Sequence, residues 1–311
     1  MNIENSGTRP KYVTWLIILS AIPAYIVILV VLTIITGIVV ALVTNTAFSD
    51  LGSIGQEYEM FSQFATQINQ LIAVIIIVNV YWVKIFKNSF VSIGFRDIGT
   101  AGKEILQGFL TGVFLIGSIF LTLYLSRQIE VTGIEFSVWY FIFYLVLFVL
   151  VGINEELLFR GYLLGTTIKL ANKYLVLAIF ALLFSLVHFL SNEFSLFPIL
   201  NIFLAGIILG LYYIHTQRLW YSISLHFTWN FLLGPVMGSN VSGNETSHSV
   251  VQQNMLGKDW VTGGTFGFEG SAVMTVILVL LITGTEIYFR YKNIENQQKE
   301  KDPGLEPSVK Y

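Results

Sequence analysis

The chain has no cysteine among its 311 residues. That absence excludes disulfides, a thiolate nucleophile, and zinc or haem sites built on cysteine ligands. Charged residues are also scarce, at 12% of the chain against about 25% in a typical soluble domain. Hydrophobic residues make up 55%, and the mean hydropathy is +0.72. The composition therefore predicts an integral membrane protein without a soluble domain, and we expect no nucleic-acid partner.

Apolar runs near the length that crosses a bilayer, about 20 residues, fill nearly the whole chain. They predict an all-α fold class, a polytopic membrane helix bundle with about eight transmembrane helices. The predicted spans are Val13–Thr44, Ile68–Phe86, Ile105–Leu125, Val138–Val151 with its continuation into the next motif, Leu175–Leu190, Phe197–His215, Leu219–Met237 and Ala272–Tyr288.

The loops between these spans carry their basic residues on one side. Of the 17 lysines and arginines, only Arg127 and Lys258 fall on the other side. Because cytoplasmic loops are enriched in Lys and Arg, both termini are predicted to be cytoplasmic. The loop 239–270 then lies outside the cytoplasm, where it is either a mobile cap or a tolerated insertion.

Two adjacent glutamates, Glu155 and Glu156, follow the apolar run Phe141–Val151. Neighbouring side chains on a helix point about 100° apart, so only one of the two faces a given site squarely. Arg160 follows Glu156 at the i,i+4 spacing of an ion pair on one helix face. Glu155 would then be the carboxylate that takes a proton from water. The alternative is an ordinary solvated helix end at the cytoplasmic surface.

Three more polar side chains, His188, His226 and Asn230, lie inside apolar runs. Phe184 precedes His188 by four residues, so its ring could wall a site and exclude water. His226 and Asn230 share one helix face and could both donate to a developing oxyanion. The plainer interpretation is that these residues hydrogen-bond neighbouring helices, as His and Asn do in membrane bundles.

Taken in order, Glu-Glu-x-x-x-Arg, Phe-x-x-x-His and His-x-x-x-Asn resemble the motifs of the CPBP family. This CAAX-protease and bacteriocin-processing family, also called Abi, includes the eukaryotic endopeptidase that trims the CAAX tails of prenylated proteins. The resemblance covers about Phe136–Met237. It implies a metal-independent glutamate protease without a cofactor, which acts on a membrane-associated protein or peptide. The expected location is a cell membrane, and the compact chain favours a bacterial one.

The resemblance also implies a role for each motif residue. Glu155 and His188 would activate the attacking water, and hydrolysis would be direct, with no covalent acyl-enzyme. His226 and Asn230 would hold the oxyanion of the tetrahedral intermediate. The residues expected to support the geometry of the site are Glu156, Arg160 and Phe184.

The resemblance divides the chain into five parts. Their predicted boundaries are 1–135 for the first three helices, 136–238 for the catalytic core of helices four to seven, 239–270 for the extracytoplasmic loop, 271–294 for the last helix and 295–311 for a disordered cytoplasmic tail.

One distance is difficult to reconcile with a single site. Glu155 is expected near the cytoplasmic end of its helix, whereas His188 lies about 14 residues into the next helix, roughly 20 Å along its axis. Either Gly152 marks a kink before the glutamates, or the helix that carries His188 begins outside the bilayer. The spacing leaves both explanations open.

Three other functions compete with proteolysis. A non-catalytic membrane scaffold, or a bacteriocin self-immunity protein of the same family, would keep the helices without the chemistry. A metallohydrolase would use Glu155, His188 and His226 as zinc ligands, although the His-Glu-x-x-His spacing is missing. A transporter is disfavoured because the polar residues form one cluster without visible half-repeats.

Overall fold

A computed structural model of the chain describes residues 10–45, 59–189 and 196–301. It is 79% helical, which confirms the predicted all-α class. The helices are α1 (Lys11–Thr44), α3 (Glu59–Ile77), α4 (Ile98–Leu125), α5 (Val138–Glu156), α6 (Gly165–Thr167), α7 (Lys173–His188), α8 (Leu196–Thr216), α9 (Trp220–Phe231), α10 (Asp259–Thr262) and α11 (Ala272–Lys301). Three of them continue into π-helical segments, which are Val78–Ile85, Leu157–Leu164 and Leu232–Val236.

Six helices of the described residues are long and apolar enough to cross a membrane, so the chain is a multi-pass membrane protein. The fifth and seventh predicted spans are not among them. α7 has 16 residues, and α9 has 12 residues before a π-helical segment of 5. All eight predicted segments are helical in their described parts, but a count of eight spans is not confirmed.

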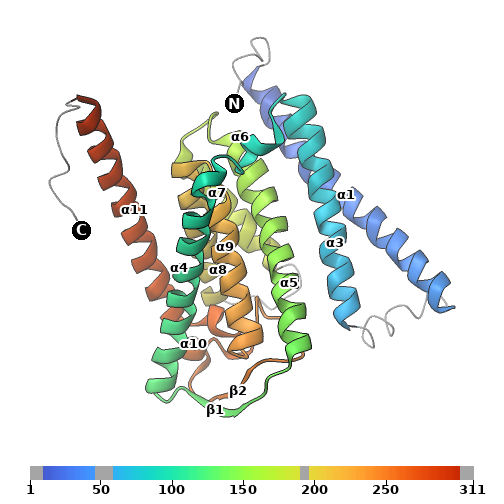
Figure 1. Cartoon of the computed structure of the whole chain (residues 1–311), viewed down its shortest axis with the longest axis vertical. Coiled ribbons are helices and arrows are strands. Elements are labelled where there is room, and N and C mark those ends of the chain that lie inside the picture. Colours follow the sequence, from blue (N-terminus) through green and yellow to red (C-terminus); the bar gives the residue numbers. More distant parts are fainter. Residues whose placement is uncertain (1–9, 46–58, 190–195, 302–311) are drawn as a thin grey trace.

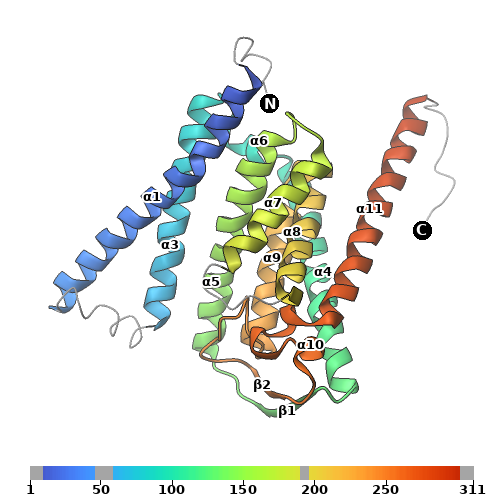
Figure 2. The ribbon, with the colours of Figure 1, turned by 180° about the vertical axis from the view of Figure 1, so that it is seen from behind.

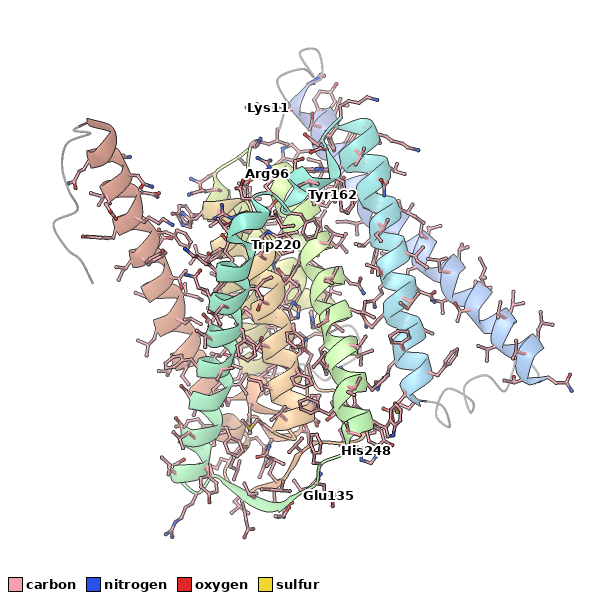
Figure 3. All side chains as sticks on the ribbon, in the orientation of Figure 1. Lys11, Arg96, Glu135, Tyr162, Trp220 and His248 are labelled. Atoms are coloured by element: carbon pink, nitrogen blue, oxygen red, sulfur yellow. The ribbon has the colours of Figure 1, made fainter. Side chains whose placement is uncertain are left out.

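The centre of the bundle consists of α4, α5, α8 and α9 (Figure 1). α1 and α3 stand on one side of it and α11 on the other, and the view from behind shows α7 in front of α8 (Figure 2). Lys11 and Arg96 lie at one end of the bundle, and Glu135 and His248 lie at the opposite end (Figure 3). The basic connections predicted to be cytoplasmic include Lys11 and Arg96; the placement of the termini in the cytoplasm stays a prediction.

A two-stranded antiparallel sheet lies at the end opposite Lys11 (Figure 1). β1 (Ile129–Ile134) pairs with β2 (Val251–Met255), and the register shifts between Val131 and Gly133. This sheet is absent from the elements predicted above. Its two strands are far apart in the chain, and strands of six and five residues give too short a periodic signal to predict their pairing.

Two glycines let α9 approach its neighbours closely. A Cβ on Gly108 of α4 would overlap the backbone of Tyr221. A Cβ on Gly152 of α5 would lie 3.4 Å from the backbone nitrogen of Phe227. Small residues at such crossings allow membrane helices to pack by backbone contact, where no hydrophobic effect drives them together. The close α5–α9 crossing places the glutamate motif beside His226.

Buried apolar residues form two clusters. The first lies among α4, α5, α8, α9 and α11. The second joins α1 and α3 to α7 and to the segment Leu157–Leu164, and it includes the fully buried Tyr162 and Tyr213. Tyr162 lies toward the end of the bundle that holds Arg96 (Figure 3). The second cluster therefore fills the end predicted to be cytoplasmic.

The first part of the tail predicted as disordered is helical. α11 continues to Lys301, so residues 295–301 belong to this helix, and the rest of the predicted tail, 302–311, lies outside the described residues. Glu, Gln and Lys are good helix formers. They extend a helix that the preceding apolar turns have already nucleated, because propagation costs much less than nucleation.

The close α4–α9 crossing can be tested with two glycines of the same helix. Gly108→Ala should lower the free energy of unfolding by about 1–3 kcal/mol, because the added methyl group must displace the backbone of α9. Gly117→Ala is the matched control, since nothing lies within 4 Å of its Cβ position. Unfolding of the purified protein in mixed micelles measures both. Equal stability of the two variants would contradict the backbone contact.

Candidate active site

A buried ion pair forms the base of the site. Arg160 Nη1 lies 2.7 Å from Glu156 Oε1, as predicted from the i,i+4 spacing. Glu156 is fully buried and Arg160 is 3% exposed. The same Oε1 accepts a hydrogen bond of 2.8 Å from Nδ1 of His226, which sequence reasoning did not predict. Glu156 therefore joins α5 to α9 and fixes the orientation of the imidazole.

Arg160 also contacts the two helices that complete the bundle around it. Its Nη2 donates to the carbonyl of Gly206 on α8 at 3.2 Å. Its guanidinium carbon lies 4.4 Å from the centre of the Phe184 ring on α7, within the range of a cation–π contact. One buried cation thus links the α5 extension to α7 and α8.

Glu155 points to a different place from Glu156, as expected for adjacent residues on a helix. Its Oε2 lies 3.8 Å from Nε2 of His188 and 3.8 Å from Nε2 of His226. This oxygen is buried and has no hydrogen-bond partner among the described residues. A buried acceptor without a partner requires an explanation such as a catalytic role or a bound water. Here it faces two imidazoles at the wall of a cavity.

The ring of His188 is held by its own helix. Nδ1 lies 2.7 Å from the carbonyl oxygen of Phe184, which can only accept, so Nδ1 carries a proton. In the neutral ring the lone pair is then on Nε2, the atom nearer to Glu155. The ring of Phe184 is 3% exposed and lies 4.5 Å, centre to centre, from the His188 ring. Phe184 therefore lies against His188 in the lining of the cavity, and its role in excluding water stays a prediction.

The mismatch in depth between Glu155 and His188 is resolved by the length of the helix. The helical run that begins at Val138 continues beyond Glu155 to Thr167, roughly 18 Å further at 1.5 Å per residue. His188 is the last residue of α7, roughly 22 Å from its start. The two residues therefore meet at similar depth, without a helix break at Gly152.

One cavity of about 400 Å³ brings most of the predicted residues together. Its lining includes Glu155, Phe184, His188, His226 and Asn230. The side chain of Asn230 is only 7% exposed, one turn along α9 from His226. Glu156 and Arg160 do not line the cavity, and the supporting role expected of them stays a prediction.

The sequence analysis missed Glu269, which also lines the cavity and is 2% exposed. Its carboxylate accepts hydrogen bonds from the indole nitrogen of Trp229 at 2.8 Å and from the backbone nitrogen of Ser242 at 2.5 Å. Burial raises the pKa of Glu269, and these two hydrogen bonds oppose that shift. The only signal in the sequence is a carboxylate close to an apolar run, which is too common to single it out.

The loop 239–270 is part of the wall of the cavity. Residues of this loop that line it are Val241, Ser242, Asn244, Glu245, Thr246 and Glu269. Asn201 of α8 anchors the end of the loop, because its Nδ2 donates to the carbonyls of Glu269 at 2.7 Å and Ser271 at 2.8 Å. An insertion without a structural role would not be bonded into the bundle in this way.

Carboxylates and imidazoles around one cavity could also suggest a metal centre. Within the described ranges, no group of three or more His, Cys, Asp or Glu side chains is arranged to hold a metal ion.

The fold and this group of side chains define a polytopic helical membrane protein with a carboxylate–histidine site inside its bundle. Residues 137–232 match the model of the Rce1-like family, described as type II CAAX prenyl endopeptidase Rce1-like. The match confirms the resemblance read from the motifs and spans all of them, from Glu155 to Asn230. It supports a CAAX-protease type of intramembrane endopeptidase. Neither the curated proteins nor the solved structures gave a match to the chain.

The buried ion pair should contribute strongly to stability. Arg160→Met should lower the free energy of unfolding by about 3–5 kcal/mol, because it leaves Glu156 as a buried charge without its partner. Arg290→Met is the matched control: Arg290 pairs with Glu286 at the same i,i+4 spacing and at 2.8 Å, but its side chain is 72% exposed, so little should change. The free energy of unfolding of each variant is measured in mixed micelles and compared with that of the wild type. If Arg160→Met lowers the free energy of unfolding no more than Arg290→Met does, the buried ion pair does not stabilise the fold as expected.

Glu269 should hold the outer loop on the bundle. In Glu269→Gln the amide cannot accept from both Trp229 and Ser242, since its nitrogen only donates. Hydrogen bonds to a charged group contribute about 1.5–3 kcal/mol, so added protease should cut the loop at least about tenfold faster. Glu245→Gln, an exposed residue of the same loop, is the control. Equal cleavage of both variants would exclude the anchoring role.

Proposed function

We propose that this protein is an intramembrane endopeptidase that hydrolyses a peptide bond in a membrane-associated protein or peptide. The observation that carries the proposal is the position of Glu155. Its unpartnered Oε2 faces Nε2 of His188 and of His226 across 3.8 Å, at the wall of a cavity. This arrangement lies in the segment that matches a family of endopeptidases.

In the proposed reaction Glu155 takes a proton from water, and the lone pair of His188 Nε2 assists. The water then adds directly to the scissile carbonyl without a covalent acyl-enzyme, which suits a chain that has no cysteine. Glu155 returns the proton to the leaving amine. Proton transfer by a positioned side chain contributes typically 10²–10⁴-fold to the rate.

His226 and Asn230 would stabilise the oxyanion. His226 already donates from Nδ1 to Glu156, so it can donate to an oxyanion from Nε2 only as an imidazolium. Before the reaction the carboxylates of Glu155 and Glu156 would compensate that charge, while Arg160 neutralises Glu156 on its other side. Once Glu155 has taken the proton from water, the negative charge of the oxyanion replaces that of Glu155. On this account, Glu156 and Arg160 are positioning residues that act through His226.

The mechanism needs no metal or cofactor, and the proposed setting is a cell membrane with both termini in the cytoplasm. The residues 136–238 would form the catalytic core, and the other helices would hold it in the bilayer. The family also includes proteins that act as scaffolds or in self-immunity, and loss of the catalytic carboxylate separates these roles from proteolysis.

The experiment is to map the N-terminal and C-terminal ends of membrane-proteome peptides in cells with the wild type, Glu155→Gln or no copy. Peptide ends that depend on the wild type and vanish with Glu155→Gln are expected. Glu130→Gln, an exposed carboxylate on β1, should behave as the wild type. If Glu155→Gln matches the wild type while deletion has a phenotype, the protein is a scaffold.

Purified protein and a substrate found in this way test the mechanism further. Asn230→Ala should lower kcat about 10²–10³-fold, the loss expected for one oxyanion donor. A chelator should leave the rate unchanged. Loss of activity that zinc alone restores would replace this mechanism with a metal-dependent one.

A further inference from the structure

Along α5 and α9 the cavity extends from Glu155 and His226 in one direction only. On α5 its lining residues are Glu155, Val151, Phe148, Leu147 and Tyr144, which lead toward the start of the helix. On α9 they are His226, Trp229 and Asn230, which lead toward the end of that helix. The start of α5 and the end of α9 lie at the same end of the bundle, beside the sheet (Figure 1).

The mouth of the cavity is formed by α3 and the outer loop. The first turns of α3 contribute Ser62, Gln63, Thr66 and Gln67, and the loop contributes residues 241, 242 and 244–246. Asn154 holds α3 in this position, since its Nδ2 donates to the carbonyl of Gln67 at 3.0 Å. Polar side chains thus surround the mouth and give water a path to the site.

The other end of the site is closed. Leu157, Tyr162, Leu163 and Leu164 are each at most 2% exposed. The hydroxyl group of Tyr213 donates to the carbonyl of Ile93 at 2.9 Å across the same region. A peptide cannot reach Glu155 through this packing, which lies toward Arg96 (Figure 3).

The direction of the opening decides from which side of the membrane a substrate can enter. The basic connections between the helices lie at the closed end of the bundle. The charge rule for membrane proteins places that end in the cytoplasm. The mouth, the sheet and the outer loop are then on the extracytoplasmic side. A tail presented in the cytoplasm would have no direct path to the catalytic carboxylate.

The charges of the lining also restrict the substrate. It includes three carboxylates, Glu155, Glu245 and Glu269, and among its described residues there is no Lys or Arg. Apart from His226, which the proposed reaction uses as an imidazolium at the oxyanion, no cationic side chain of the lining is therefore placed to bind an acidic side chain or a terminal carboxylate of the substrate. Like charges brought together in an interface cost several kcal/mol, so such a wall discriminates against acidic peptides.

We propose that the substrate is an extracytoplasmic segment of an exported or membrane-anchored polypeptide, which enters beside the outer loop and carries neutral or basic residues around the scissile bond. The substrate class rests on the proposed endopeptidase function. The side of access does not, because it follows from the cavity and the loop charges alone.

Single cysteines test the side of access without background, since the chain has none. In intact cells, a membrane-impermeant maleimide should label Glu245→Cys at the mouth and Val151→Cys in the cavity. Val146→Cys on the same helix is the matched control: Val146 is 41% exposed but faces away from the cavity, and it should not react in lipid. Lys103→Cys should react only after lysis. Labelling of Lys103→Cys but not Glu245→Cys in intact cells would overturn the proposal.

A tethered reporter tests the substrate class. One cleavable sequence is attached to a single-span anchor on either side of the membrane, with Lys or Glu next to the bond. The wild type should cleave only the extracytoplasmic form, at least about tenfold faster with Lys than with Glu, and Glu155→Gln should cleave neither. Cleavage of the cytoplasmic form, or no preference for Lys, would overturn the substrate class. If no form is cleaved, the endopeptidase function fails, and the labelling pattern still decides the side of access.

Discussion

The structure depends on keeping one buried charge paired. Glu156 is fully buried within an apolar bundle, where an isolated carboxylate would be very costly. It is bonded to Arg160 on its own helix and to His226 on α9, and Arg160 in turn reaches α8 and α7. The contacts that begin at Oε1 of this one carboxylate therefore set the relative positions of four helical segments.

The positions of those helices determine what the neighbouring carboxylate can do. Because Glu156 points toward α9, Glu155 points to the cavity, where it meets His188 and His226. Gly152 allows the close crossing of α5 and α9 that this requires. The unpartnered oxygen of Glu155 is a local loss of stability, and the bonded network behind it holds that oxygen in place.

The outer loop completes the site from the opposite end of the bundle. Its sheet pairing with β1 and its bonds to Asn201 and Trp229 fix it against the bundle. Through Glu245 and Glu269 it adds two of the three carboxylates in the lining. The segment that matches the protease family ends at residue 232, so this wall comes from outside that segment.

The sequence by itself determined the membrane class, the helical fold, the motif residues and the Glu156–Arg160 pair. These depend on composition and on spacing within one helix, which local geometry fixes. Only the tertiary structure decided that Glu156 bonds His226, that Glu155 and His188 meet at one depth, that two predicted spans are short, and that Glu269 reaches the cavity. Each of these joins segments far apart in the chain, and their approach depends on how whole helices pack, which no local spacing encodes.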